Sequence, residues 1–172
     1  MSSVVFLKAV NVGGPQKFQP TALARDLARL GIVNLGAAGT FVVRETIGPK
    51  DLRAEILRCL PFEPEMMICS GNEIQALAVD DSFIPKGSAE GVKPFVTVLE
   101  KAPRNVPKLP RQWPAGEKWE VRLTQVRGRF ALGVWRRLGK AILYPNAVLE
   151  KEFGLAATTR GWNTIARLAT LL

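Results

Sequence analysis

The first seventy residues alternate between short apolar runs and stretches with helical spacing, and this order constrains the fold more than any other feature. Four runs bounded by glycine, proline or polar residues are typical of strands: VVFLKAV, IVNLG, TFVVRE and EMMICS. Leucines recur at helical spacing after the first run, up to Gly31, and again after the third, up to Pro61. The order over residues 3–70 is therefore β-α-β-β-α-β. It predicts a ferredoxin-like subdomain, an antiparallel sheet with both helices on one face.

The second half predicts a smaller α+β unit, reached through a connecting helix in GNEIQALAVD. KPFVTVLEK is typical of one strand, and residues 118–137 of two strands joined by a turn near Gly128. Alternation places Trp119, Val121 and Leu123 on one buried face. A proline-rich crossover lies between these strands, and two helices close the chain. The predicted fold class is α+β: a ferredoxin-like βαββαβ subdomain at 1–80, packed with a smaller C-terminal antiparallel sheet plus two terminal helices at 81–172.

The charge of the chain is concentrated in its second half. The net charge is +9, and residues 87–172 carry all of it because residues 1–86 are neutral. This asymmetry favours an anionic partner, nucleic acid or another polyanion, although a solvated face would give the same composition. Trp113 and Trp135 are candidates for stacking on bases. The predicted phosphate-contacting residues are Arg122, Arg127, Arg129, Arg136, Arg137 and Lys140. Reversing Arg127 and Arg129 to Glu is expected to abolish binding with little change in melting temperature.

Several chemistries are excluded by what the sequence lacks. Histidine is absent, which removes Ser-His-Asp and Cys-His catalysis and most transition-metal sites. No catalytic residue, metal or cofactor is nominated, so enzymatic activity is undecided, with a binding protein favoured. No apolar run reaches 18 residues, so no membrane association is expected. The N-terminus is typical of a strand and not of a signal peptide, and Cys59 and Cys69 are expected to be reduced thiols in a cytoplasmic protein.

An alternative function is a small-molecule binder or enzyme acting on an anionic metabolite. The loop NVGGPQK could present backbone N–H groups to an anion, although its spacing matches neither nucleotide-binding glycine motif. In the closing stretch, Thr158 or Thr159 could cap the last helix, while Arg160 and Asn163 could bind an anion or backbone carbonyls. The residues predicted for such a site, in a cleft between the loop and the closing motif TTRGWNT, are Lys8, Asn11, Gly13, Gly14, Lys17, Thr159, Arg160, Trp162 and Asn163.

Three segments resemble a known family: FLKAVNVGG, LARLGIVNLGAAGTFVV and LEKEFGLAATTRGWNTIARLA. Over essentially the whole chain the sequence is similar to the bacterial family of domain of unknown function 1697. The family typically reads T-x-R-N-W-N-T near its end, where this chain has Gly161 in place of the first asparagine. It has Arg-Gly where this chain has Lys8 and Ala9, and Q-S-G-N where this chain has AAGT. The resemblance implies an α+β protein with a ferredoxin-like first half and no established activity, with residues 11–14 and 158–164 as candidate walls of one site.

Overall fold

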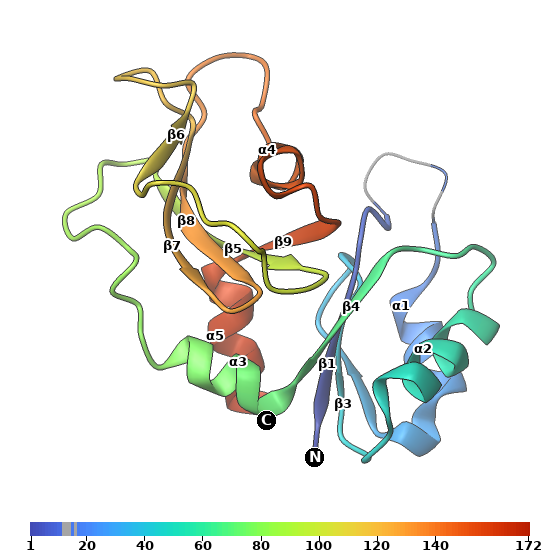
Figure 1. Ribbon diagram of the computed structural model, residues 1–172. Helices are drawn as coiled ribbons and strands as arrows, with labels where there is room; N and C mark the ends of the chain where they lie inside the picture. The colour runs from blue at the N-terminus through green and yellow to red at the C-terminus, as the bar shows by residue number, and fades with distance from the viewer. Residues whose placement is uncertain (12–14, 16) are drawn as a thin grey trace. The chain divides into compact units, whose positions relative to one another are not determined.

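A computed structural model describes residues 1–11, 15 and 17–172 (Figure 1). The chain forms two compact units, one of residues Met1–Val79 and Ala166–Leu172 and the other of residues Asp80–Ile165. The last seven residues thus group with the first unit, whereas the sequence assigned the whole closing helix to the second half. Within the described residues, no helix combines the length and the apolar character that crossing a bilayer requires.

The first unit contains one antiparallel sheet of four strands in the order β2-β3-β1-β4. The elements follow one another in the predicted order β-α-β-β-α-β, with a further helix after the last strand. Gly31, at φ +59°, ends the first helical segment as its position in the sequence predicted. The elements are β1 (Ser3–Leu7), α1 (Pro20–Asp26), a 3₁₀ turn (Ala28–Leu30), β2 (Ile32–Asn34), β3 (Thr40–Val43), α2 (Pro49–Arg58), β4 (Met66–Ser70) and α3 (Gly71–Ala78).

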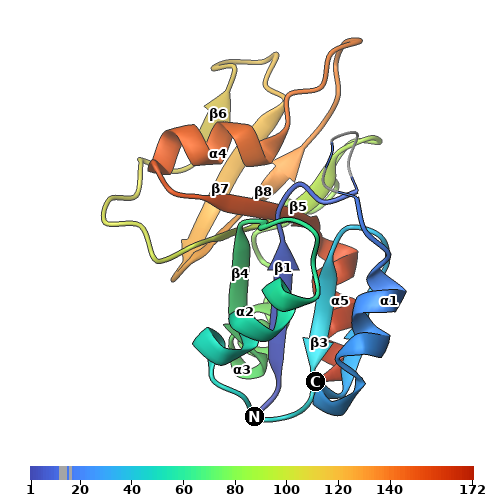
Figure 2. The same ribbon diagram turned by 90° about the vertical axis from the view of Figure 1, so that its right-hand side faces the viewer.

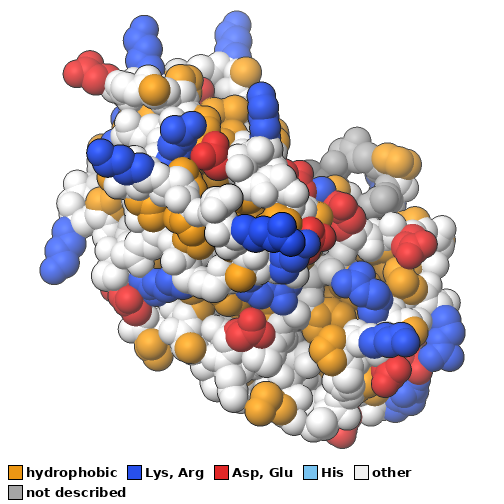
Figure 3. All heavy atoms as spheres, in the orientation of Figure 1, with side chains coloured by type: hydrophobic (Ala, Val, Ile, Leu, Met, Phe, Trp, Pro, Cys, Tyr) orange, Lys and Arg blue, Asp and Glu red, His pale blue; other side chains and the backbone are white. Residues whose placement is uncertain are grey.

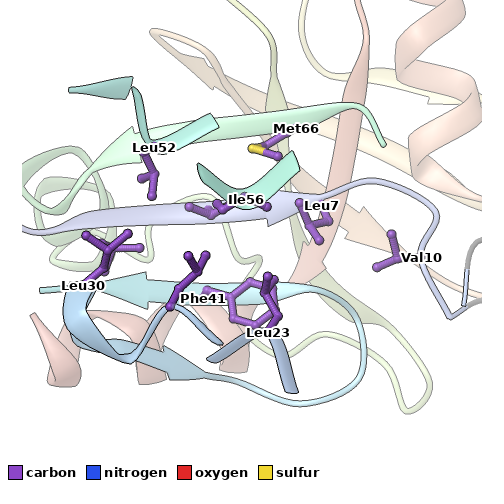
Figure 4. Packing of buried hydrophobic residues seen from close by; sticks show 11 residues of the cluster. Leu7, Val10, Leu23, Leu30, Phe41, Leu52, Ile56 and Met66 are labelled. Atoms are coloured by element: carbon purple, nitrogen blue, oxygen red, sulfur yellow. The ribbon is translucent and has the colours of Figure 1, made fainter. Parts of the chain in front are cut away.

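The core of the first unit lies between the sheet and the first two helices. Leu7 and Phe41 come from adjacent strands, and Leu23, Leu52 and Ile56 come from α1 and α2, all at most 2% exposed. Figure 4 shows these side chains pointing toward one another from their separate elements. The helical leucine repeat therefore faces the sheet, as an amphipathic helix must to bury its apolar stripe.

The second unit contains an antiparallel sheet of five strands in the order β6-β7-β8-β5-β9. Its helix α4 crosses one face of this sheet (Figure 2) and lies next to β5 and β9. Leu149 of α4 is fully buried in a cluster with Phe95 and Leu123 of the sheet. The elements are β5 (Lys93–Leu99), β6 (Arg111–Trp113), β7 (Val121–Arg127), β8 (Phe130–Trp135), α4 (Pro145–Phe153), β9 (Ala157–Gly161) and the start of α5 (Trp162–Leu171).

Two predictions for the second half were wrong. Its sheet is not the smaller one, because β6 and β9 join the three strands expected from the sequence. Thr158 and Thr159 do not cap the last helix: they lie in β9, opposite Val98 and Thr97 of β5. β-Branched threonines fit an extended strand well, and helix α5 begins only at Trp162. The predicted alternation in β7 is confirmed, since Trp119 is 7% exposed and Val121 and Leu123 are fully buried.

Candidate nucleic-acid interface

The arginines at the tip of the β7–β8 hairpin are bonded within their own unit. Arg127 forms an ion pair with the Asp80 carboxylate at 2.9 Å and donates from Nη1 to the Asp80 carbonyl at 2.9 Å. Arg129 donates from Nε to the Leu99 carbonyl at 2.9 Å. Hydrogen bonds from Ser82 lower the pKa of Asp80, and the charge of Arg127 adds to this effect. These two arginines therefore hold the hairpin against neighbouring segments.

Two further arginines of the predicted set lie over Trp119. The guanidinium carbons of Arg122 and Arg136 are 4.0 and 4.1 Å from the centroid of its ring. Arg136 also donates from Nε to the Trp119 carbonyl at 2.8 Å. When the side-chain oxygen of Gln112 faces Arg122, it accepts hydrogen bonds from Nη2 and Nε of Arg122 at 2.7 and 2.8 Å. Partial burial lowers the pKa of Arg122, and the nearby charge of Arg136 lowers it further.

The last two members of the set, Arg137 and Lys140, are exposed in the segment that follows β8. Arg137 donates from Nε to the Gly139 carbonyl at 2.8 Å. The six predicted residues therefore divide into four half-buried arginines, bonded within the unit, and two exposed cations.

The structure changes the expected result of reversing Arg127 and Arg129. Arg127→Glu would place a carboxylate beside Asp80, and Arg129→Glu would remove the donor from the Leu99 carbonyl. We expect the double variant to lose about 2 kcal/mol of unfolding free energy, because several hydrogen bonds and an ion pair are lost together. Urea unfolding followed by circular dichroism measures this. Reversing two exposed lysines, Lys118 and Lys140, is the matched control and should cost less than about 0.5 kcal/mol. Equal stability of both variants would contradict the bonding described here.

Four other cations of the second unit, Lys101, Arg104, Arg111 and Lys151, are exposed and line two adjoining hollows. The larger hollow, which we call the β6–α4 groove, has a volume of about 700 Å³. The smaller has a volume of about 310 Å³, and Glu152 lines both. The groove is lined by Arg111, Trp113, Pro114, Leu143, Ala147, Val148, Lys151 and Glu152. The smaller hollow is lined by Lys101, Ala102, Arg104, Asn105, Glu152, Phe153 and Leu155.

The groove combines an aromatic ring with cations at its edge. The Arg111 guanidinium carbon is 5.6 Å from the centroid of the half-buried Trp113 ring, within the range of a cation–π contact. Arg111 Nε is also 3.7 Å from a carboxylate oxygen of Glu152, which makes a long ion pair. Lys151 is exposed on α4. Figure 3 shows Lys and Arg side chains projecting around hydrophobic surface, over the region where β6 and α4 lie in Figure 1.

Trp113 was named from the sequence as a stacking candidate, but the cations that line its groove and the adjoining hollow were not. Lys101, Arg104 and Arg111 lie in the proline-rich crossover, and Lys151 lies in α4. Only the pairing of β6 with β7 and the packing of α4 on the same sheet bring the crossover and the helix to one groove. The charge excess of residues 87–172 was the one signal in the sequence that pointed to this region.

In the first unit, two of the residues predicted for a small-molecule site, Lys8 and Asn11, are held by local contacts. Gly13 and Gly14 lie outside the described residues. Lys8 forms an ion pair with Glu65, and Lys17 is exposed. Asn11 donates from Nδ2 to the Ala37 carbonyl at 3.0 Å and accepts at Oδ1 from the Phe18 amide, also at 3.0 Å. Asn11 therefore ties the start of its loop to the turn before β3.

In the second unit, the residues of the closing motif also bond to their neighbours. Arg160 is 9% exposed, and its Nη1 donates to Thr158 Oγ1 at 2.8 Å and to the Thr159 carbonyl at 2.9 Å. Burial lowers the pKa of Arg160 to about 10, which leaves it charged at neutral pH. Thr159 shares a hydrogen bond of 2.7 Å with Thr97. Asn163 is exposed.

The remaining aromatic residue of that motif has a packing role. Trp162, the first residue of α5, meets Phe83 edge to face, with ring centroids 5.1 Å apart. Such a pair adds about 0.5–1.5 kcal/mol beyond the buried area alone. Trp162 therefore fixes the start of α5 within the second unit. Among the described residues, no group of three His, Cys, Asp or Glu side chains is placed to hold a metal ion.

One solved structure shows the same arrangement of elements. It is a conserved bacterial protein from Streptococcus pneumoniae, 14% identical to this chain, and the two superpose with a TM-score of 0.62. The alignment covers 99% of this chain and 97% of that one, so the likeness in fold extends over the full length of both. No family model matches the chain, and a comparison with curated proteins finds no match. The likeness shows the α+β fold, with its two antiparallel sheets.

Proposed function

We propose that the second unit binds nucleic acid without strong sequence preference, and we favour a binding protein over an enzyme. The observation that carries this proposal is a set of four exposed cations beside Trp113 and the adjoining hollow: Arg111 and Lys151 line the β6–α4 groove with Trp113, and Lys101 and Arg104 line the smaller hollow. Cationic side chains contact phosphates, and an aromatic side chain offers a base a surface for stacking. The proposal moves the contact region from the β7–β8 hairpin to the crossover and α4, because four hairpin arginines are bonded within the unit.

The distribution of charge between the two units supports the same proposal. The second unit carries 15 basic and eight acidic residues, whereas the first carries nine and seven. Long-range attraction of a polyanion would therefore be directed at the second unit. Arg137 and Lys140, exposed after β8, would add to this attraction.

We also infer that the chain belongs to the bacterial family of domain of unknown function 1697 and works in the cytoplasm. The family inference rests on the closing motif. Two residues of this motif make specific contacts: Arg160 bonds to Thr158, and Trp162 packs on Phe83. Cys59 and Cys69 are both free thiols, as suits a reducing compartment. Because Thr158, Thr159 and Arg160 are bonded within the unit, we favour a polyanion over an anionic metabolite as partner.

Fluorescence anisotropy of labelled oligonucleotides across a salt series tests the proposal. We expect micromolar binding at low salt, with log affinity falling linearly as log salt rises. Four phosphate contacts to a single strand would give a slope of about −3, since each contributes about −0.7. Absence of binding at low salt, for single- and double-stranded DNA and RNA alike, would refute the proposed function.

A further inference from the structure

We propose that the β6–α4 groove takes unpaired bases, so that the ligand is a single strand and not a duplex. This inference rests on the proposed function and adds the location and the strandedness of the ligand. The groove has an apolar wall of Leu143, Ala147 and Val148, which a ligand made only of phosphates could not use. Its volume, about 700 Å³, is within the range of small-ligand sites, roughly 300–1,000 Å³.

The residues that line the groove favour a ligand that is both aromatic and negatively charged. Trp113 lines the groove, with the Arg111 guanidinium 5.6 Å from its ring centroid. Indole and guanidinium groups are both planar and both stack on nucleobases. The bases of a duplex are already stacked within the helix, so this apolar surface is useful only to an unpaired base.

The two adjoining hollows provide a path for the backbone that carries those bases. Lys151 lines the groove itself, and Lys101 and Arg104 line the smaller hollow beyond Glu152. A strand with one base in the groove would place its neighbouring phosphates near these cations. The cations and the Trp113 ring therefore favour the same ligand, a single strand with unpaired bases.

Glu152 is the one carboxylate that lines both hollows, and it opposes an anion there. Its ion pair with Arg111 is long, at 3.7 Å, so an arriving phosphate could draw the guanidinium away at little cost. Glu152→Gln removes the repulsion while keeping the size of the side chain. We expect this variant to bind a single strand about three- to tenfold more tightly at low salt.

The test compares a labelled twelve-nucleotide oligothymidylate with a duplex of the same length, using the full chain. Wild type should bind the single strand at least about tenfold more tightly than the duplex, because stacking on one base is worth about 1–3 kcal/mol. A matched pair of variants at Ala147 probes the groove without removing core packing, because this residue is exposed on α4. Ala147→Glu should weaken binding of the single strand more than tenfold, and Ala147→Gln less than threefold. Trp113→Ala should remove the preference for the single strand, and Trp113→Phe should keep it.

The outcomes separate this inference from the proposed function. Equal binding of single strand and duplex, unaffected by either Ala147 variant, would overturn the groove as the base site and leave nucleic-acid binding standing. No binding of either oligonucleotide would overturn both. A polyglutamate peptide that displaces the oligothymidylate as well as unlabelled oligothymidylate does would also overturn the inference, since it would show that charge alone is recognised.

Discussion

Replacing Gly133 by alanine should destabilise the protein by about 3–4 kcal/mol, because the added methyl group would meet backbone that cannot move aside. Gly133 lies in β8, the central strand of the second sheet, opposite Leu123 of β7. A Cβ atom at this position would be 2.0 Å from the carbonyl oxygen of Arg122 and 3.0 Å from the Phe95 ring. The strands approach closely beside a register shift between Leu123 and Gln125. Close approach of another backbone is a recognised reason for glycine within a strand.

Urea unfolding followed by circular dichroism measures this effect. Gly161→Ala is the matched control, because Gly161 ends β9 in the same sheet and its Cβ would meet nothing within 4 Å. The control should change the unfolding free energy by less than about 0.5 kcal/mol. A Gly133→Ala variant as stable as the control would show that β7 and β8 do not approach as described.

Replacing Trp119 by alanine should lower the free energy of unfolding by about 4 kcal/mol, which is usual for truncating a large buried aromatic side chain. Trp119 is 7% exposed and precedes β7 on its buried side. Its ring is the surface on which the guanidinium groups of Arg122 and Arg136 rest, at 4.0 and 4.1 Å from the centroid. Without the ring, a cavity would open and both guanidinium groups would lose their cation–π partner.

Trp119→Phe is the control for this variant, because phenylalanine keeps an aromatic face for the two arginines. We expect it to recover more than half of the stability lost in Trp119→Ala, as measured by the same urea transition. Equal loss in both variants would mean that the size of the indole matters and that cation–π stacking does not. A loss below about 1 kcal/mol in Trp119→Ala would contradict its place in the core.

The first unit was largely predictable because each of its apolar patterns fits only one type of secondary structure. The strand runs around Val5 and Phe41 and the leucine repeat ending at Leu30 bury almost completely, so their periodicity records the core directly. Gly31 supplied the left-handed stop that the sequence indicated. In the second unit, Trp119, Val121 and Leu123 alternated with polar residues and pointed inward as predicted.

Strands β6 and β9 could not be predicted, for different reasons. The buried residues of β9 include polar ones, and β6 is short. β9 buries Thr158 and Arg160, whose hydrogen bonds replace apolar packing, and such residues also suit a helix N-terminus. β6 has only three residues, Arg111–Trp113, within a segment rich in proline. Pairing with β7 makes it a strand, and that partner is distant in sequence.

The candidate site was predictable in its charge but not in its residues. Counting cations located the second half correctly as the basic part. It could not separate exposed cations from those that hydrogen-bond within the unit. Arg127 follows Val126 and Arg136 follows Trp135, as exposed side chains of a strand would, and yet they bond to Asp80 and to the Trp119 carbonyl. An arginine with five N–H donors can serve a nearby carbonyl as readily as a phosphate, and only tertiary structure decides between them.

Photo-crosslinking shows directly whether a single strand binds in the β6–α4 groove. The full chain would be irradiated with an oligonucleotide carrying 5-iodouracil and digested, and the crosslinked peptide would be identified by mass spectrometry. We expect crosslinks to the peptide containing Trp113, lost in Ala147→Glu and kept in Ala147→Gln. Crosslinks confined to the β7–β8 hairpin or to the first unit would contradict it.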